Sequence, residues 1–155
     1  MVRILHKVIS LMSALLVAIA LLLGTIYLYN NSIASEVLAE LTRIPLPINC
    51  KQLESAAVPG KMFGNGNGMQ YIGAILFSSD MQMEAIESHF IAYNPNIFVM
   101  EFKNASQTLG NVFKNQYTPE TLQNAYIAVL CASQENGMIS SDIIGSILNC
   151  DPRGH

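Results

Sequence analysis

The first thirty residues of the chain are almost entirely apolar. From Val8 to Tyr29 no side chain carries a charge, and the run is rich in Leu, Ile and Ala. As an α-helix, these roughly 22 residues are long enough to cross about 30 Å of hydrocarbon. A helix in the core of a soluble protein is rarely apolar all round for about six turns. The pattern therefore predicts a transmembrane helix, which contacts membrane lipid through residues 8–29.

The charges on either side of this helix predict its orientation. Arg3 and Lys7 precede it, and the first charges after it are Glu36 and Glu40. Because basic flanks stay in the cytoplasm, we expect a single-pass protein of the cell membrane, with its N-terminus cytoplasmic and its C-terminal domain outside. Residues 32–34 (Ser-Ile-Ala) would suit a signal peptidase, but the apolar run is longer than the about 7–15 residues of a cleaved signal. An uncleaved signal anchor is therefore the favoured interpretation.

The region after the anchor is predicted to begin with a stalk. Ser35–Leu41 continues as a short helix, and the stretch Ile44–Pro47 ends it, because proline lacks a backbone N–H and favours extended geometry before it. The chain then divides into a cytoplasmic flank and anchor (1–34), a stalk and Pro-containing linker (35–49) and an extracytoplasmic domain (50–155).

The outer domain opens with the pattern of a β-hairpin. Cys50–Val58 is predicted to be extended, and the block Gly64-Asn65-Gly66-Asn67-Gly68 supplies residues that tolerate positive φ in turns. Met69–Ser78 is apolar on both alternating faces, as in a central strand covered on both sides. We expect these two strands to pair with each other.

A helix is predicted after this hairpin, from Met81 to about Tyr93. Ser79 or Asp80 is expected to cap it, and Asn94-Pro95 ends it. Its apolar residues recur at steps of three and four, so one face should pack on the sheet. That face consists of Met83, Ile86, Phe90 and Tyr93.

The remainder contains further strand and helix patterns. Strands are predicted at Ile97–Lys103 and Tyr126–Ala132, a short strand at Asn111–Lys114, a helix start at Thr118 and a helix over Ile139–Leu148. The fold class is therefore α+β, with an N-terminal transmembrane helix followed by one small domain that has a mostly antiparallel sheet and one or two packed helices.

Three stretches of the chain are similar to a group of small bacterial membrane-anchored proteins without an assigned activity. They are Ile44–Pro47, the block from Gly60 through Gly64-Asn65-Gly66-Asn67-Gly68 to Leu76, and the C-terminal Asp151–His155, which ends in Arg-Gly-His. The resemblance covers most of the outer domain, although only the central block is distinctive. It implies location and architecture, and it carries over no catalytic residue.

Charge argues against one class of function. Two of the eight basic residues precede the anchor, whereas all eleven acidic residues follow it. Nucleic-acid binding usually requires a basic surface, so no nucleic-acid partner is expected.

Candidate ligand-binding residues are few. Asn65 and Asn67 could offer their amides to a polar ligand such as a glycan, although a plain hairpin turn is the commoner use of such a block. His155, close to Asp151, could bind a ligand, but terminal residues are more often frayed or paired locally. No metal site and no cofactor are predicted.

The three cysteines are Cys50, Cys131 and Cys150, and they form no C-x-x-C motif. Zinc and redox motifs are therefore unsupported. If one disulfide forms outside the cytoplasm, Cys50–Cys150 is the favoured pair, since it would fasten the first strand to the C-terminus. Cys131 lies in an apolar strand pattern and is expected to be a small buried side chain.

Three functional hypotheses follow. The leading one is a non-enzymatic, membrane-tethered module of the cell envelope that binds another protein or a glycan. The second is a small envelope hydrolase that uses His89 or His155 with a carboxylate as acid and base. The third is a structural subunit of a membrane complex, in which small residues of the anchor pack against other helices. These small residues are Ser10, Ser13, Ala14, Ala18 and Gly24.

Overall fold

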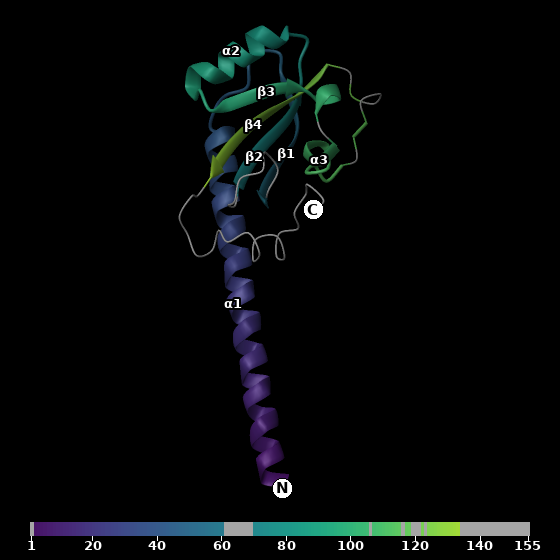
Figure 1. The fold of residues 1–155 in the computed structure, drawn as a ribbon. Coiled ribbons are helices and arrows are strands. Elements are labelled where there is room, and N and C mark those ends of the chain that lie inside the picture. Colours follow the sequence, from purple (N-terminus) through teal and green to yellow (C-terminus); the bar gives the residue numbers. More distant parts are fainter. Residues whose placement is uncertain are drawn as a thin grey trace.

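The computed structural model describes residues 2–60, 70–105, 107–115, 117–118, 122 and 124–133. Its elements are α1 (Val2–Thr42), β1 (Lys51–Gly60), β2 (Gln70–Ser78), α2 (Met83–Tyr93), β3 (Ile97–Glu101), a 3₁₀ turn (Phe102–Asn104), α3 (Gln107–Gly110) and β4 (Ala125–Ser133). A long N-terminal helix, a four-stranded antiparallel sheet and a second packed helix confirm the predicted α+β class (Figure 1).

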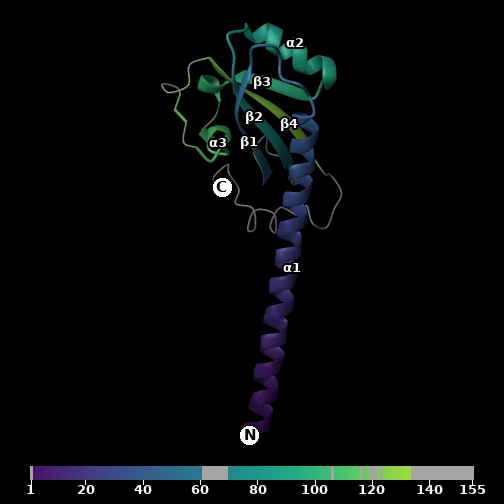
Figure 2. The same ribbon diagram turned by 180° about the vertical axis from the view of Figure 1, so that it is seen from behind.

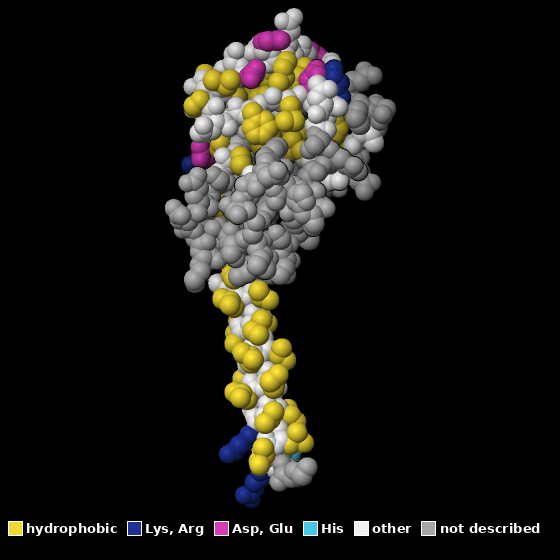
Figure 3. Space-filling model, in the orientation of Figure 1, with side chains coloured by type: hydrophobic (Ala, Val, Ile, Leu, Met, Phe, Trp, Pro, Cys, Tyr) yellow, Lys and Arg dark blue, Asp and Glu magenta, His cyan; other side chains and the backbone are white. Residues whose placement is uncertain are grey.

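Helix α1 is one unbroken helix of 41 residues with two different surroundings. Its N-terminal half extends from the domain, and apolar side chains cover it on the side that Figure 3 shows. This half makes α1 long and apolar enough to span a membrane. From Ile26 onward, one face of the same helix is buried in the domain. The buried residues on this face are Ile26, Asn30, Ala34, Val37 and Leu41.

The segment predicted to be a stalk belongs in part to the domain. Ser35–Leu41 is helical as predicted, but it does not stand free, because Val37 and Leu41 are buried among residues of the sheet. The helix ends at Thr42, just before Pro45, where the chain turns through a hydrogen bond from the N–H of Ile44 to the carbonyl of Leu41 (3.2 Å). The last four turns of α1 are therefore a layer of the domain, continuous with the apolar half.

The sheet has the strand order β1-β2-β4-β3, and every neighbouring pair is antiparallel. The predicted hairpin is confirmed, because Lys51 lies opposite Ser78 and Gly60 lies opposite Gln70. Strand β2 is central, and all of its side chains from Tyr71 to Phe77 are buried, as its continuous apolar pattern predicts. Strands β1 and β3 form the two edges of the sheet.

Each face of the sheet is covered by a different kind of structure. Helices α1 and α2 cover one face, and the segment from Phe102 to Tyr117, which contains α3, covers the other. Figures 1 and 2 show that α2 lies at the end of the domain farthest from the N-terminus of α1. Buried residues of the first face include Tyr71, Ile75, Phe77, Phe90 and Tyr126, and those of the second include Ile72, Leu76, Leu109, Phe113 and Ile127.

Helix α2 differs in detail from the prediction. It begins at Met83, and its N-cap residue, Gln82, makes no capping hydrogen bond through its side chain. The hydroxyl of Ser79 accepts instead from the N–H of Met81 (3.0 Å), so it shapes the turn before the helix. Tyr93, predicted to face the sheet, is 56% exposed because the helix ends there.

Two further predictions for the second half were wrong in part. Strand β3 ends at Glu101, and Phe102 turns into the 3₁₀ segment, where it is buried on the second face of the sheet. Residues 111–114 form turns and bends instead of a short strand. The predicted strand at Tyr126–Ala132 is confirmed as β4. The helix predicted at 139–148 lies outside the described residues.

Gly73 is required by the close approach of α1 to β2. A Cβ atom at this position would lie 2.7 Å from the Cα of Leu38 and 2.8 Å from its backbone nitrogen. Both of these atoms belong to the helix backbone, which cannot move aside as a flexible side chain can. Glycine therefore sets how tightly the helix packs on the sheet.

We predict that Gly73→Ala destabilises the domain by about 1–3 kcal/mol, because overpacking must displace α1 from β2. Chemical unfolding of the full chain in detergent measures this loss. Gly110→Ala is the matched control, since no described residue would lie within 4 Å of its added Cβ. An equal loss of stability in both variants would contradict the proposed role of Gly73.

Candidate functional site

Most of the candidate site residues predicted from the sequence, for ligand binding or for a disulfide, lie outside the residues that the structure describes. Asn65, Asn67, Cys150 and His155 all lie outside the described residues. Cys50 lies just before β1, is half-buried and packs against the core cluster on the α1 face. Its pairing with Cys150 therefore stays a prediction.

His89 has a structural partner. It lies on α2, and its Nε2–H donates to the backbone carbonyl of Pro45 (2.7 Å), so this ring nitrogen carries the hydrogen. Its ring also contacts those of Phe90 and Tyr93, with centroids 5.5 and 5.3 Å apart. This hydrogen bond goes to a carbonyl oxygen, whereas the acid–base hypothesis requires a carboxylate. The contacts hold α2 against the segment that follows α1.

A second polar contact joins the end of α2 to α1 itself. The side-chain amide of Asn94 donates to Oε1 of Glu40 on α1 (3.0 Å), and its carbonyl oxygen accepts from the N–H of Asn96 (2.9 Å). The C-terminal end of α2 is thereby tied to the C-terminal end of α1. The position of α2 relative to the long helix is therefore specified at two points.

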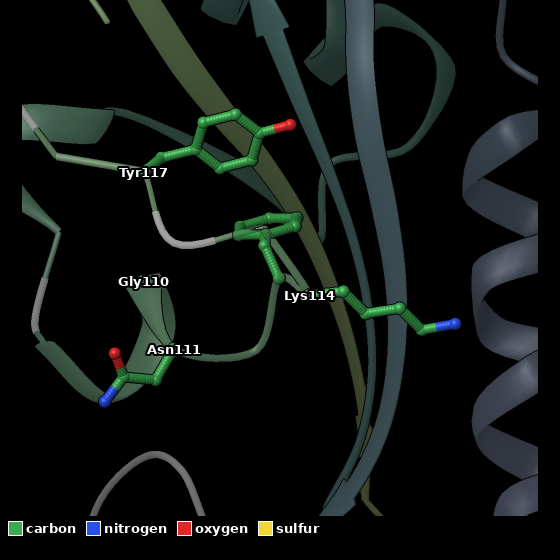
Figure 4. Close-up of a pocket in the computed structure, with 5 residues that line it drawn as sticks. Gly110, Asn111, Lys114 and Tyr117 are labelled. Atoms are coloured by element: carbon green, nitrogen blue, oxygen red, sulfur yellow. The ribbon is translucent and has the colours of Figure 1, made fainter. Parts of the chain in front are cut away.

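An open hollow lies on the other face of the sheet, beside α3. It has a volume of about 600 Å³. Among the described residues, its lining consists of Gly110, Asn111, Phe113, Lys114 and Tyr117 (Figure 4). Figure 4 shows that the side chain of Lys114 extends away from Asn111, so cation and amide do not converge on one point. This hollow was not predicted from the sequence, because residues 111–114 were expected to form a strand.

Glu54 on β1 holds the loop that lines this hollow. Its carboxylate accepts from the N–H of Lys114 (2.6 Å), the N–H of Asn115 (3.3 Å) and the side-chain amide of Asn115 (2.9 Å). Burial alone would raise the pKa of this carboxyl, but the hydrogen bonds outweigh it and hold the pKa below its ordinary value of 4.5. Glu54 is therefore ionised at neutral pH and acts as a brace for the loop.

Metal binding gains no support from the described part of the chain. Within it, no group of three or more His, Cys, Asp or Glu side chains is arranged to hold an ion. The carboxylates of Glu40 and Glu54 accept hydrogen bonds from Asn94 and from the backbone of Lys114, so both serve local structure.

Comparisons of the chain with protein-family models, curated proteins and solved structures found no significant match. The resemblance to small bacterial membrane-anchored proteins stays a prediction. Function must therefore be inferred from the geometry of the described residues.

We predict that Glu54→Gln makes the stability of the folded domain depend less on pH in the acidic range. Since the folded state lowers the pKa of Glu54, the ionised carboxylate stabilises the fold above the pKa of the unfolded chain. This stabilisation is lost as the pH falls through the folded-state pKa. The variant should be less stable than the parent at neutral pH, and the difference should shrink at a pH of about 3.

Thermal unfolding of the full chain in detergent at the two pH values measures this effect. Glu87→Gln is the control, because Glu87 is an exposed carboxylate on α2. If Glu54→Gln and Glu87→Gln changed the pH dependence of the unfolding temperature equally, the charge of Glu54 would not be what stabilises the loop.

Proposed function

We propose that this chain is a membrane-tethered, non-enzymatic module of the cell envelope that binds another protein or an envelope component. The observation that carries the proposal is the division of α1 into an exposed apolar half and a half packed on the sheet. Such a helix places a folded domain beside a bilayer with no separate linker. Its apolar half requires a nonpolar environment, which a lipid bilayer supplies.

Polar side chains in the exposed half of α1 support a location in lipid. The hydroxyl of Ser13 donates to the carbonyl of Ile9 (3.0 Å), and that of Thr25 donates to the carbonyl of Leu21 (2.8 Å). In hydrocarbon no water is present to satisfy these groups, so bonding to the helix's own backbone lowers the cost of burying them. Both residues are therefore compatible with a membrane-spanning helix.

The proposed orientation rests on charge. Arg3 and Lys7 lie at the N-terminal end of α1, and the next charged residue along the chain is Glu36, at the level of the domain. By the positive-inside rule the domain would lie outside the cytoplasm.

Helix α2 is the surface that we propose for binding. It lies at the end of the domain farthest from the N-terminus of α1, so a partner can approach it without obstruction from the bilayer (Figure 1). Glu84 and Glu87 are exposed on it, and Ile91 and Tyr93 are 44% and 56% exposed. Aromatic and large aliphatic side chains are common at the centres of protein interfaces. A partner with a basic, partly apolar surface would complement this helix.

The enzymatic alternative has less support. A hydrolase based on His89 would need a carboxylate beside the imidazole, whereas Nε2 of that ring is hydrogen-bonded to the Pro45 carbonyl. The non-enzymatic proposal gives His89 the role of holding α2 in place. His155 lies outside the described residues.

A structural subunit is the second candidate function. Ser10, Ala14 and Ala18 recur at steps of four in the exposed half of α1, a spacing that allows helices to approach closely in membranes. In this candidate, copies of α1 or other membrane helices would cover that face. Cross-linking of the protein in native membranes, followed by mass analysis, separates this assembly from a monomer that binds through α2.

We predict that protease added to intact cells removes the outer domain and leaves a protected fragment that contains the N-terminal part of α1. Mass analysis of the membrane fraction identifies the fragment. Cells opened before treatment serve as the control, because they show whether the folded domain can be digested at all. Protection in intact cells, combined with digestion in opened cells, would contradict the proposed orientation.

We predict that the double variant Ile91→Ser, Tyr93→Ser loses its partner. Removing two apolar side chains from an interface should lower the amount of co-purified partner by about tenfold or more. The measurement compares proteins recovered with each variant from detergent extracts of membranes. Lys114→Ser is the control, since Lys114 is exposed on the segment that covers the other face of the sheet. Equal recovery with both variants would exclude α2 as the binding surface.

A further inference from the structure

One end of the sheet is fixed at the level of a particular turn of α1. The hydroxyl of Tyr71 donates to Oδ1 of Asn30 on α1 (3.1 Å), and both side chains are fully buried. Tyr71 is the second residue of β2, and Gln70 before it lies opposite Gly60 and Ser133 in the neighbouring strands. The ends of three strands therefore lie close to the turn of α1 that contains Asn30.

This turn directly follows the expected span. The uncharged apolar run ends at Tyr29, and Tyr27 and Tyr29 are 46% and 43% exposed. Tyrosine is enriched at the boundary between hydrocarbon and headgroups. At 1.5 Å per residue, Asn30 lies only about 5 Å along the helix axis from Tyr27. No spacer separates the span from the domain.

The domain cannot swing away from this position without breaking α1 or its packing. The helix continues without interruption to Thr42, and the backbone of Leu38 lies against Gly73. Val37 and Leu41 are buried beyond that contact. Span and sheet therefore move as one body.

We propose that the end of the sheet formed by Gly60, Gln70 and Ser133 faces the lipid headgroups, with α2 directed away from the bilayer. This inference rests on the proposed membrane anchoring. Of the exposed residues of α1 at this level, Ser32 and Ser35 carry no charge and Glu36 is acidic, so none of them is a cation that would attract anionic lipid. The contact is therefore expected with neutral phosphatidylcholine headgroups and needs no anionic lipid.

The absence of tryptophan from the sequence provides a direct test. Single tryptophans are introduced by Leu16→Trp in the span, Gln70→Trp at the sheet end and Tyr93→Trp on α2, each in the full chain in phosphatidylcholine vesicles. Ser32→Trp, at an exposed position of α1, is a second reporter of the headgroup level in case the substitution at Gln70 disturbs the fold. Fluorescence is quenched either by bromines deep in the acyl chains or by nitroxides on the headgroups.

We expect acyl-chain bromines to quench Leu16→Trp strongly. Headgroup nitroxides should quench Gln70→Trp and Ser32→Trp several-fold more than Tyr93→Trp. If Leu16→Trp were not quenched, the proposed anchoring itself would fail. If Leu16→Trp were quenched but Gln70→Trp and Ser32→Trp were no more sensitive to headgroup nitroxides than Tyr93→Trp, only the headgroup contact would be overturned. A requirement for anionic lipid would equally contradict the neutral contact.

Discussion

At Gly73 the backbone of the central strand β2 approaches helix α1 so closely that no side chain fits between them. This contact brings Val37 and Leu41 into the same core cluster as Tyr71, Ile75 and Phe77 of the sheet. Burying each large apolar side chain contributes at most about 1.5–3 kcal/mol, so the helix supplies a substantial part of the stability of a small domain. The rest of the architecture depends on this contact, because α2 is in turn attached to the end of α1.

The two faces of the sheet are covered in different ways. On the α1 face, two helices provide regular apolar surfaces, and the polar bonds of His89 and Asn94 set their relative position. On the other face, a largely irregular segment supplies Leu109 and Phe113, and the backbone N–H groups of residues 111–115 belong to no helix or strand. The carboxylate of Glu54 accepts hydrogen bonds from two of these groups. Charge on an edge strand thus compensates for the irregular backbone that covers it.

The sequence predicted the elements better than it predicted how they combine. The hairpin, β4 and α2 were all predictable, because their apolar periodicity reflects burial directly. The double role of α1 was not predictable from the sequence. A lipid bilayer and a protein core both favour apolar side chains, so the residues before and after Ile26 show the same apolar pattern although only the later ones pack on the sheet. The pairing of Glu54 with Asn115 joins residues far apart in the chain, and no local pattern records it. Of the predicted ligand residues, Asn65, Asn67 and His155 remain predictions.

The continuity of α1 also has a mechanical consequence. A helix of 41 residues is about 60 Å long, with one half apolar enough to span a bilayer and the other half packed in the domain. A transmembrane helix responds to a thinner or thicker bilayer by changing its tilt. Because α1 is continuous between its two halves, the tilt of such a helix in a membrane would also set the direction in which α2 points. Bilayer thickness would therefore change the orientation in which the domain presents α2 to a binding partner.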